Sequence, residues 1–248
     1  MEASQEPVDR VVVLHDEGRG FDQPPDDSMG AGQQIQPRGI PSETQFGSLT
    51  IKIRTHLWIS WGRIAIKHET TAHAVRQEMQ QPSADQSGLL LQEADASLEG
   101  ICAAAFALEA LSRELVPLGG IPQATVQKWR KQEDRPKAEN VALEVLSQTF
   151  DTRGVYSSWG DELEWLFGMR GSSVHYEGVF EPPKLHPLGM NVAPTQEAYS
   201  ADNVTRAVNL LLGILERCRD KPKPPAKQWS QDMRGAVNEL IGHRGQTV

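Results

Sequence analysis

The sequence predicts an all-α protein, a helical bundle of four to five main helices with a disordered N-terminal tail. Apolar residues recur at alternating spacings of three and four in several stretches, which is the spacing of one buried helix face. Clusters of proline and glycine separate these stretches. The first 47 residues differ, with nine acidic and three basic side chains and few apolar ones. Such a segment cannot bury enough apolar surface to fold.

The first two helices are predicted at about 55–80 and 88–116. A β-rich start at 48–53 precedes the first of them, and a proline at position 82 ends it. The second has the clearest apolar seam of the chain, made by Leu91, Ala94, Leu98, Ile101, Ala105, Leu108, Ser112 and Leu115. Small residues at 102–105 indicate that a neighbouring helix approaches closely there.

After a charged stretch at about 127–137, four further helices are predicted, at about 138–150, 159–175, 201–219 and 228–241. A proline-rich connector covers 177–196, and Ser200 is the predicted N-cap of the helix that follows it. The predicted organisation is an acidic tail over 1–47, a helical domain over 48–219, and a linker with a short C-terminal helix over 220–248.

Composition limits the classes of function. The net charge of the 248-residue chain is −8, but without the tail 24 acidic and 22 basic residues remain, a charge of only −2. We therefore expect no large basic surface, while a small phosphate site is compatible with this balance. Two cysteines, Cys102 and Cys218, exclude a disulfide framework and a four-thiolate metal site.

The sequence also predicts a cytoplasmic protein without membrane contact. No apolar stretch approaches the roughly 20 residues of a membrane helix. The first residues are acidic and lack the apolar core of a secretory signal. Within the tail, an apolar island at 11–14 is a candidate contact for a protein partner.

The strongest chemical signal lies at Arg170 and His175. Arg170 interrupts an apolar stripe, and burying a lone charge is costly, so it must be paired or hydrated. Five positions separate the two residues, which places them about 140° apart on a helix, so both can border one cleft near its end. A permanent cation and a group that titrates near neutral pH suit phosphate chemistry. The alternative is a structural arginine followed by a histidine that interacts with the helix dipole.

The motif Arg170-x4-His175, late in a helix of an all-α bundle, resembles the Arg-x4–6-His motif of HEPN domains. Three further segments fit: Leu-Glu-Ala-Leu at 108–111, Glu-Pro-Pro-Lys-Leu-His-Pro at 181–187, and Tyr-Ser-Ala-Asp-Asn-Val-Thr-Arg-Ala-Val at 199–208. Over about 50–219 the chain looks like a group of bacterial, mostly actinobacterial, HEPN-like proteins.

The resemblance implies a specific activity. HEPN domains are helical bundles, often homodimers in which two motifs meet, and many are metal-independent endoribonucleases in toxin, antiviral or RNA-processing systems. It implies that His175 is a general acid and base in attack of the ribose 2′-hydroxyl on the adjacent phosphate. Arg170 would bind that phosphate and stabilise its charge. RNA or a nucleotide is then the partner, and no cofactor or metal is expected. Other HEPN proteins are noncatalytic nucleotide-binding or protein-interaction modules, and this alternative stays open.

The family pattern also points to supporting residues. The residue after the arginine is usually polar, often asparagine, whereas here it is Gly171. Ser172 and Ser173 are candidates to supply the missing hydrogen bonds. An acidic residue on an earlier helix often supports the motif, and Glu109 is the first candidate, followed by Glu93.

Other signals have ordinary structural explanations. His186, in the connector, either reaches the cleft or fixes the connector by hydrogen bonding. The segment from His68 to His73 suggests a zinc site, but its histidines are five apart instead of four, which turns the second one away by about 100°. Tryptophans can stack on nucleic-acid bases, but at helical spacing core packing is the preferred interpretation. The residues concerned are Trp58, Trp61, Trp129, Trp159 and Trp165.

Overall fold

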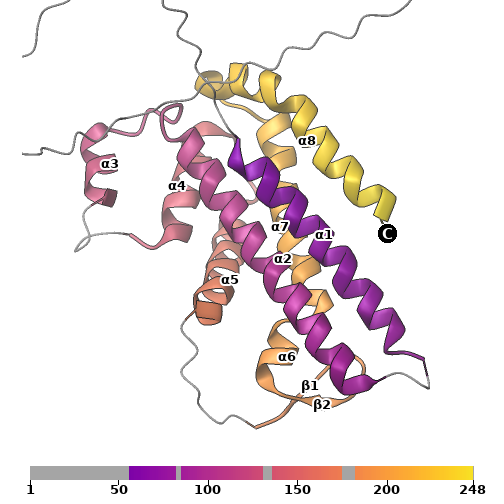
Figure 1. Ribbon diagram of the computed structural model, residues 1–248. Coiled ribbons are helices and arrows are strands. Elements are labelled where there is room, and N and C mark those ends of the chain that lie inside the picture. Colours follow the sequence, from indigo (N-terminus) through magenta and orange to yellow (C-terminus); the bar gives the residue numbers. More distant parts are fainter. Residues whose placement is uncertain (1–55, 82–84, 131–135, 175–181, 248) are drawn as a thin grey trace, which may run out of the picture. The chain divides into compact units, whose positions relative to one another are not determined.

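Two long antiparallel helices, α1 (Leu57–Glu78) and α2 (Gln86–Leu115), form the centre of the computed structural model (Figure 1). A third, α7 (Ala201–Asp220), packs against both of them. Gly100 makes this approach close, because a Cβ atom at that position would lie only 2.5 Å from Cγ2 of Val204. Small side chains on the buried face of α2 therefore set the distance between the central helices.

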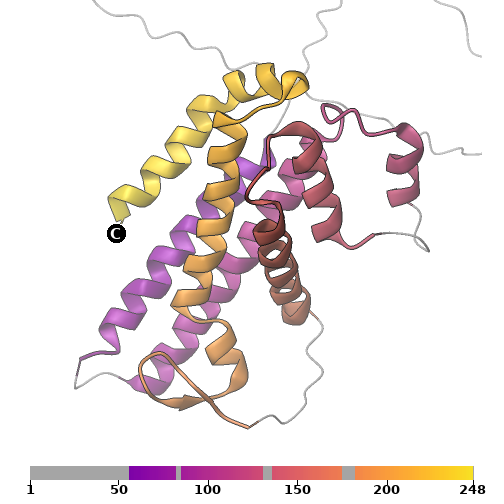
Figure 2. The ribbon, with the colours of Figure 1, turned by 180° about the vertical axis from the view of Figure 1, so that it is seen from behind.

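The last helix, α8 (Lys227–Thr247), packs against α7 and α1 and runs along one edge of the bundle, as the view from behind also shows (Figure 2). A short 3₁₀ turn at Pro224–Ala226 leads into it. Its side chains at Trp229, Val237 and Leu240 belong to the main core. The helix is longer than the predicted 228–241, and in its added part Arg244 donates a hydrogen bond to Glu69 of α1.

On the other side, α4 (Ala138–Thr149) and α5 (Tyr156–Val174) pack against α2 and against each other. The short helix α3 (Gln123–Arg130) stands beside the bundle (Figure 1). The sequence predicted only a charged stretch there. Pro122 starts the helix, since its carbonyl accepts hydrogen bonds from the backbone of Thr125 and Val126.

The proline-rich connector contains regular structure that the sequence did not predict. Two short strands, β1 (Lys184–Leu185) and β2 (Asn191–Val192), form an antiparallel hairpin. Gly189 supplies the positive φ of its turn, at +81°. A single-turn helix, α6 (Pro194–Ala198), then leads to α7, and the hairpin and α6 lie at one end of the bundle (Figure 1).

The described residues are 56–81, 85–130, 136–174 and 182–247. Their architecture confirms the all-α fold class. Helix boundaries for α1, α2, α4, α5 and α7 lie within a few residues of the predicted ones. None of the helices described is both long and apolar enough to cross a membrane. The predicted tail over 1–47 and its apolar island lie outside the described residues.

Candidate functional site

Arg170 lies at the edge of the buried face of α5, near its C-terminal end. Leu163 and Leu166 on the same helix are fully buried, whereas the side chain of Arg170 remains 30% exposed. Its Nη1 donates a hydrogen bond to Oε2 of Glu109 at 2.8 Å, and its Cζ lies 4.5 Å from the ring centre of Phe106. Two side chains of α2, Glu109 and Phe106, therefore act as the partners that an arginine in this apolar stripe needs.

Glu109 is shared between two arginines. Its Oε1 accepts a hydrogen bond from Nη2 of Arg113 at 2.5 Å, while Oε2 accepts the one from Arg170. Because one carboxylate faces two guanidinium groups, the cluster carries a net charge of +1. Arg113 is 69% exposed, so Arg170 is the more enclosed of the two cations.

Arg170 retains hydrogen-bonding capacity. Among the described residues, only its Nη1 is engaged, and Nε and Nη2 have no acceptor. These two nitrogens form one edge of the guanidinium fork, which matches two oxygens of a phosphate or carboxylate. The residue can therefore remain bound to Glu109 and still receive an anion.

Arg170 lines an open groove of about 520 Å³ between the start of α4 and the end of α5. Two cations and two anions border the groove: Lys137, Arg170, Glu139 and Glu164. The Nζ of Lys137 lies 3.7 Å from a carboxylate oxygen of each glutamate, so its charge is balanced locally. The groove offers one incompletely paired guanidinium without a broad basic surface.

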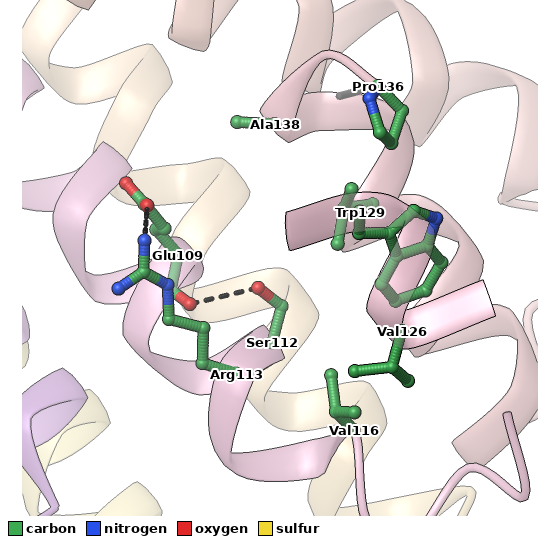
Figure 3. A pocket seen from close by; sticks show the side chains of 9 residues that line it. Glu109, Ser112, Arg113, Val116, Val126, Trp129, Pro136 and Ala138 are labelled. Carbon is green, nitrogen blue, oxygen red and sulfur yellow. Dashed lines mark hydrogen bonds and ion pairs between the residues drawn. The ribbon is translucent and has the colours of Figure 1, made fainter. Parts of the chain in front are cut away.

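Glu109 also lines a second cleft, of about 490 Å³ (Figure 3). Glu109, Ser112 and Arg113 of α2 form its polar wall, and Trp129 of α3 lies across from them. Ala138 borders both this cleft and the Arg170 groove. The Glu109–Arg170 ion pair therefore connects two depressions that share a border.

The two serines after the motif arginine donate hydrogen bonds within their own helix, and Ser173 also contacts the thiol of Cys102 on α2 at 3.5 Å. The Oγ of Ser172 donates to the carbonyl of Gly168 at 3.1 Å, and that of Ser173 donates to the carbonyl of Arg170 at 2.7 Å. Neither lines the groove as described. Gly171 does line it, and no atom lies within 4 Å of where its Cβ would stand. The candidate catalytic residue His175 lies outside the described residues.

Tyr199 fixes the end of α5 that carries Arg170. Its hydroxyl donates a hydrogen bond to the carbonyl of Met169 at 3.0 Å. Burial raises the pKa of this phenol, and the nearby Cys102 thiol acts in the same direction. The hydroxyl therefore stays protonated at neutral pH and keeps its donor role.

His186 and Glu93 form a different cluster. His186 is fully buried, and its Nε2 lies 3.3 Å from Oε2 of Glu93. The backbone N–H of Leu188 donates to Nδ1 of His186, which assigns the proton to Nε2. Glu93 and Glu109 are 16 positions apart on α2, or about 24 Å along its axis. The structure places His186 at Glu93, outside the residues that line the Arg170 groove, and its ring accepts a hydrogen bond from Leu188 within the connector.

The Glu93 cluster includes a residue that the sequence analysis missed. Arg76 of α1 donates to Oε1 of Glu93 through Nε at 3.0 Å and Nη2 at 2.6 Å, and a third donor to this oxygen is the backbone of Ala201. The sequence does contain a sign of this cluster, because Glu93 falls between Leu89 and Ala96 on the buried face of α2. A carboxylate at such a position requires partners.

Glu114, near the end of α2, has a role of which the sequence contains no sign. It accepts hydrogen bonds from the indole N–H groups of Trp58 and Trp229, at 3.1 and 2.6 Å, and it lies 2.9 Å from Nδ1 of His56. The carboxylate thereby links α1, α2 and α8. No local pattern identifies this site, because its donors lie far apart in the sequence.

The histidines that suggested zinc have other partners. Nδ1 of His68 lies 2.9 Å from a carboxylate oxygen of Glu99, and Nε2 of His73 lies 2.7 Å from the hydroxyl of Thr205. Over the described ranges, no group of histidine, cysteine or acidic residues has the arrangement of a metal site.

Of the residues predicted to support the motif, the structure thus brings Glu109 to Arg170 and places Glu93 and His186 elsewhere. Comparison of the chain with models of known families, with curated proteins and with solved structures finds no match.

Proposed function

We propose that this protein is a HEPN-like, metal-independent endoribonuclease that acts as a homodimer. The observation that supports the proposal best is the state of Arg170. Its Nη1 is held by Glu109, while Nε and Nη2 remain without an acceptor among the described residues, beside an open groove. A guanidinium fixed in this way is prepared to bind a phosphate by its free edge.

The proposed reaction uses the RNA itself as nucleophile. His175 removes the proton from the ribose 2′-hydroxyl, whose oxygen attacks the adjacent phosphorus. The bond from phosphorus to the 5′-oxygen breaks, and that oxygen takes up a proton as it leaves. Arg170 stabilises the negative charge on the phosphate oxygens. The products are a 2′,3′-cyclic phosphate and a 5′-hydroxyl end.

Glu109 has a positioning role in this proposal. It holds Arg170 against the ring of Phe106, which limits the rotamers of a long side chain. Because Glu109 also binds Arg113, its charge is shared, and Arg170 keeps part of its attraction for an anion.

The test is cleavage of a labelled single-stranded RNA by the wild type and by Arg170→Ala and His175→Ala variants. We expect each variant to lose at least about 100-fold in rate with unchanged helical circular dichroism. EDTA should have no effect, and a substrate with a single 2′-deoxy nucleotide at the cleaved position should not be cut. Wild-type rates in both variants would contradict the proposal.

Arg206→Ala is the matched control. Arg206 also stacks on an aromatic ring, with its Cζ 3.9 Å from the centre of Trp165, and it also pairs with a glutamate, Glu162. It lies on α7, outside the Arg170 groove. Both variants therefore remove an arginine that stacks on a ring and pairs with a glutamate. Only Arg170→Ala should abolish cleavage.

The second candidate function is a noncatalytic HEPN-like module that binds a nucleotide or a protein partner. The observation that favours it is Gly171, which leaves the groove without the polar side chain that usually follows the motif arginine. Since no atom lies within 4 Å of its Cβ position, Gly171→Asn can be introduced without a clash there. Faster RNA cleavage in this variant supports the enzyme, whereas nucleotide binding without cleavage in both proteins supports the module.

A further inference from the structure

The cleft between α2 and α3 has two chemically different walls (Figure 3). Glu109, Ser112 and Arg113 are polar and come from one face of α2. The opposite wall carries the indole of Trp129, together with apolar side chains such as Val126. A volume of about 490 Å³ is within the range of small-molecule sites.

Trp129 differs from the other tryptophans. Trp58, Trp159 and Trp229 are buried in the core. Trp61 packs against Phe106 with ring centres 5.0 Å apart, and Trp165 lies under Arg206. In the described parts of the chain, Trp129 has neither a ring partner nor a cation over its face, and it lines an open cleft. Part of its indole packs against the core, and the part that lines the cleft is available for stacking.

The polar wall carries both kinds of hydrogen-bonding group. The carboxylate of Glu109 accepts, and the 69% exposed guanidinium of Arg113 donates. The hydroxyl of Ser112 already donates to the carbonyl of Glu109, so towards the cleft it is an acceptor. These two walls match a flat ring that stacks on the aromatic wall and carries hydrogen-bond donors and acceptors along the edge that faces the polar wall.

We propose that this cleft binds the base of a nucleotide whose phosphate lies at Arg170. Glu109 belongs to the wall of the cleft and is hydrogen-bonded to Arg170, and Ala138 borders both depressions. The base stacks on Trp129, and its edge meets Glu109 and Arg113. The proposal rests on the proposed phosphate-binding role of Arg170, and it adds a base-binding subsite to it.

Isothermal titration calorimetry of the full chain with the four nucleoside 5′-monophosphates and with ribose 5-phosphate tests this subsite. Ribose 5-phosphate carries the phosphate without the base. We expect at least one nucleotide to bind about 10-fold more tightly than ribose 5-phosphate, the size of effect that stacking of one base provides. Equal affinities, or no binding of any nucleotide, would overturn the proposal.

Three variants assign the effect. Trp129→Leu should lower nucleotide affinity to that of ribose 5-phosphate, while Trp129→Phe, which keeps a ring, should stay close to the wild type. Trp165→Leu, at the tryptophan covered by Arg206, is the control and should leave both affinities unchanged. Unaltered nucleotide affinity in Trp129→Leu, with unchanged circular dichroism, would overturn the subsite.

Arg170→Ala separates the subsite from the proposed function. A loss of affinity for both ligands supports the phosphate at Arg170 and the base beside it. If Arg170→Ala changes neither affinity while Trp129→Leu still lowers that of the nucleotide, the base site stands, and it is the phosphate role of Arg170 that is contradicted.

Discussion

The carboxylate of Glu93, on α2, accepts a hydrogen bond at 2.8 Å from the backbone N–H of Ala201, the first residue of α7. Ser200 occupies the N-cap position as predicted, but its side chain makes no capping hydrogen bond. The first N–H groups of a helix need acceptors and favour negative charge. Here a buried carboxylate of another helix meets that need, so the start of α7 is set by tertiary contact.

Glu93→Gln should destabilise the fold strongly. The variant removes the buried negative charge beside Arg76, whose side chain is only 12% exposed, and leaves Asp202, which is 60% exposed, as its other carboxylate partner. Removing one partner from a buried ion pair costs about 3 kcal/mol. Urea unfolding followed by circular dichroism measures this change. The control Glu99→Gln alters a carboxylate that is 61% exposed and should cost less than about 1 kcal/mol. Equal effects of the two variants would show that the Glu93 cluster is not a stabilising centre.

Glu114→Leu should loosen the contact of α8 with the rest of the bundle. The variant leaves the indole N–H groups of Trp58 and Trp229 without an acceptor, and each unpaired buried donor costs about 1–3 kcal/mol. We expect a lower free energy of unfolding and a red shift of tryptophan fluorescence. Glu216→Leu, at an exposed position of α7, is the control. It should change the free energy of unfolding by no more than about 0.5 kcal/mol and leave the emission maximum unchanged. An unchanged emission spectrum in Glu114→Leu would contradict this role.

Two glycine substitutions should act in opposite directions. Gly100→Ala places a methyl group 2.5 Å from Val204 and should cost about 1–3 kcal/mol through overpacking. Gly213→Ala, on α7, meets no atom within 4 Å and should stabilise the protein by about 0.5–1 kcal/mol, because alanine favours a helix. Thermal unfolding of both variants checks the prediction, which fails if Gly100→Ala is as stable as Gly213→Ala.

The two thiols should differ in reactivity. Burial raises the pKa of the Cys218 thiol, so little of the reactive thiolate forms at neutral pH, whereas Cys102 is only partly buried. A thiol reagent at neutral pH should therefore modify Cys102 in the folded protein and reach Cys218 only after unfolding. The Cys102→Ser variant should show no fast reaction without urea. Rapid modification of Cys218 in the folded variant would contradict the buried position.

Much of the helical architecture follows from local patterns. The apolar seam at 88–116 corresponds to α2 at Gln86–Leu115, and the stripe at 138–150 to α4 at Ala138–Thr149. Such boundaries are predictable because a helix that buries one face needs apolar residues at its own period. The helix α3 and the hairpin at Lys184–Val192 were not predicted, since elements this short have little intrinsic stability.

By itself the sequence determined that Arg170 interrupts a buried stripe and therefore needs a partner, because an isolated charge is costly to bury. Only the tertiary structure decided that the partner is Glu109. Glu109 and Glu93 both lie on α2, and the choice depends on where α5 crosses it. His186, in the connector, lies instead at Glu93, about 24 Å from Glu109 along α2. Periodicity fixes which face of a helix is buried, but the side chain that meets a given residue is set by how two helices, distant in sequence, pack together.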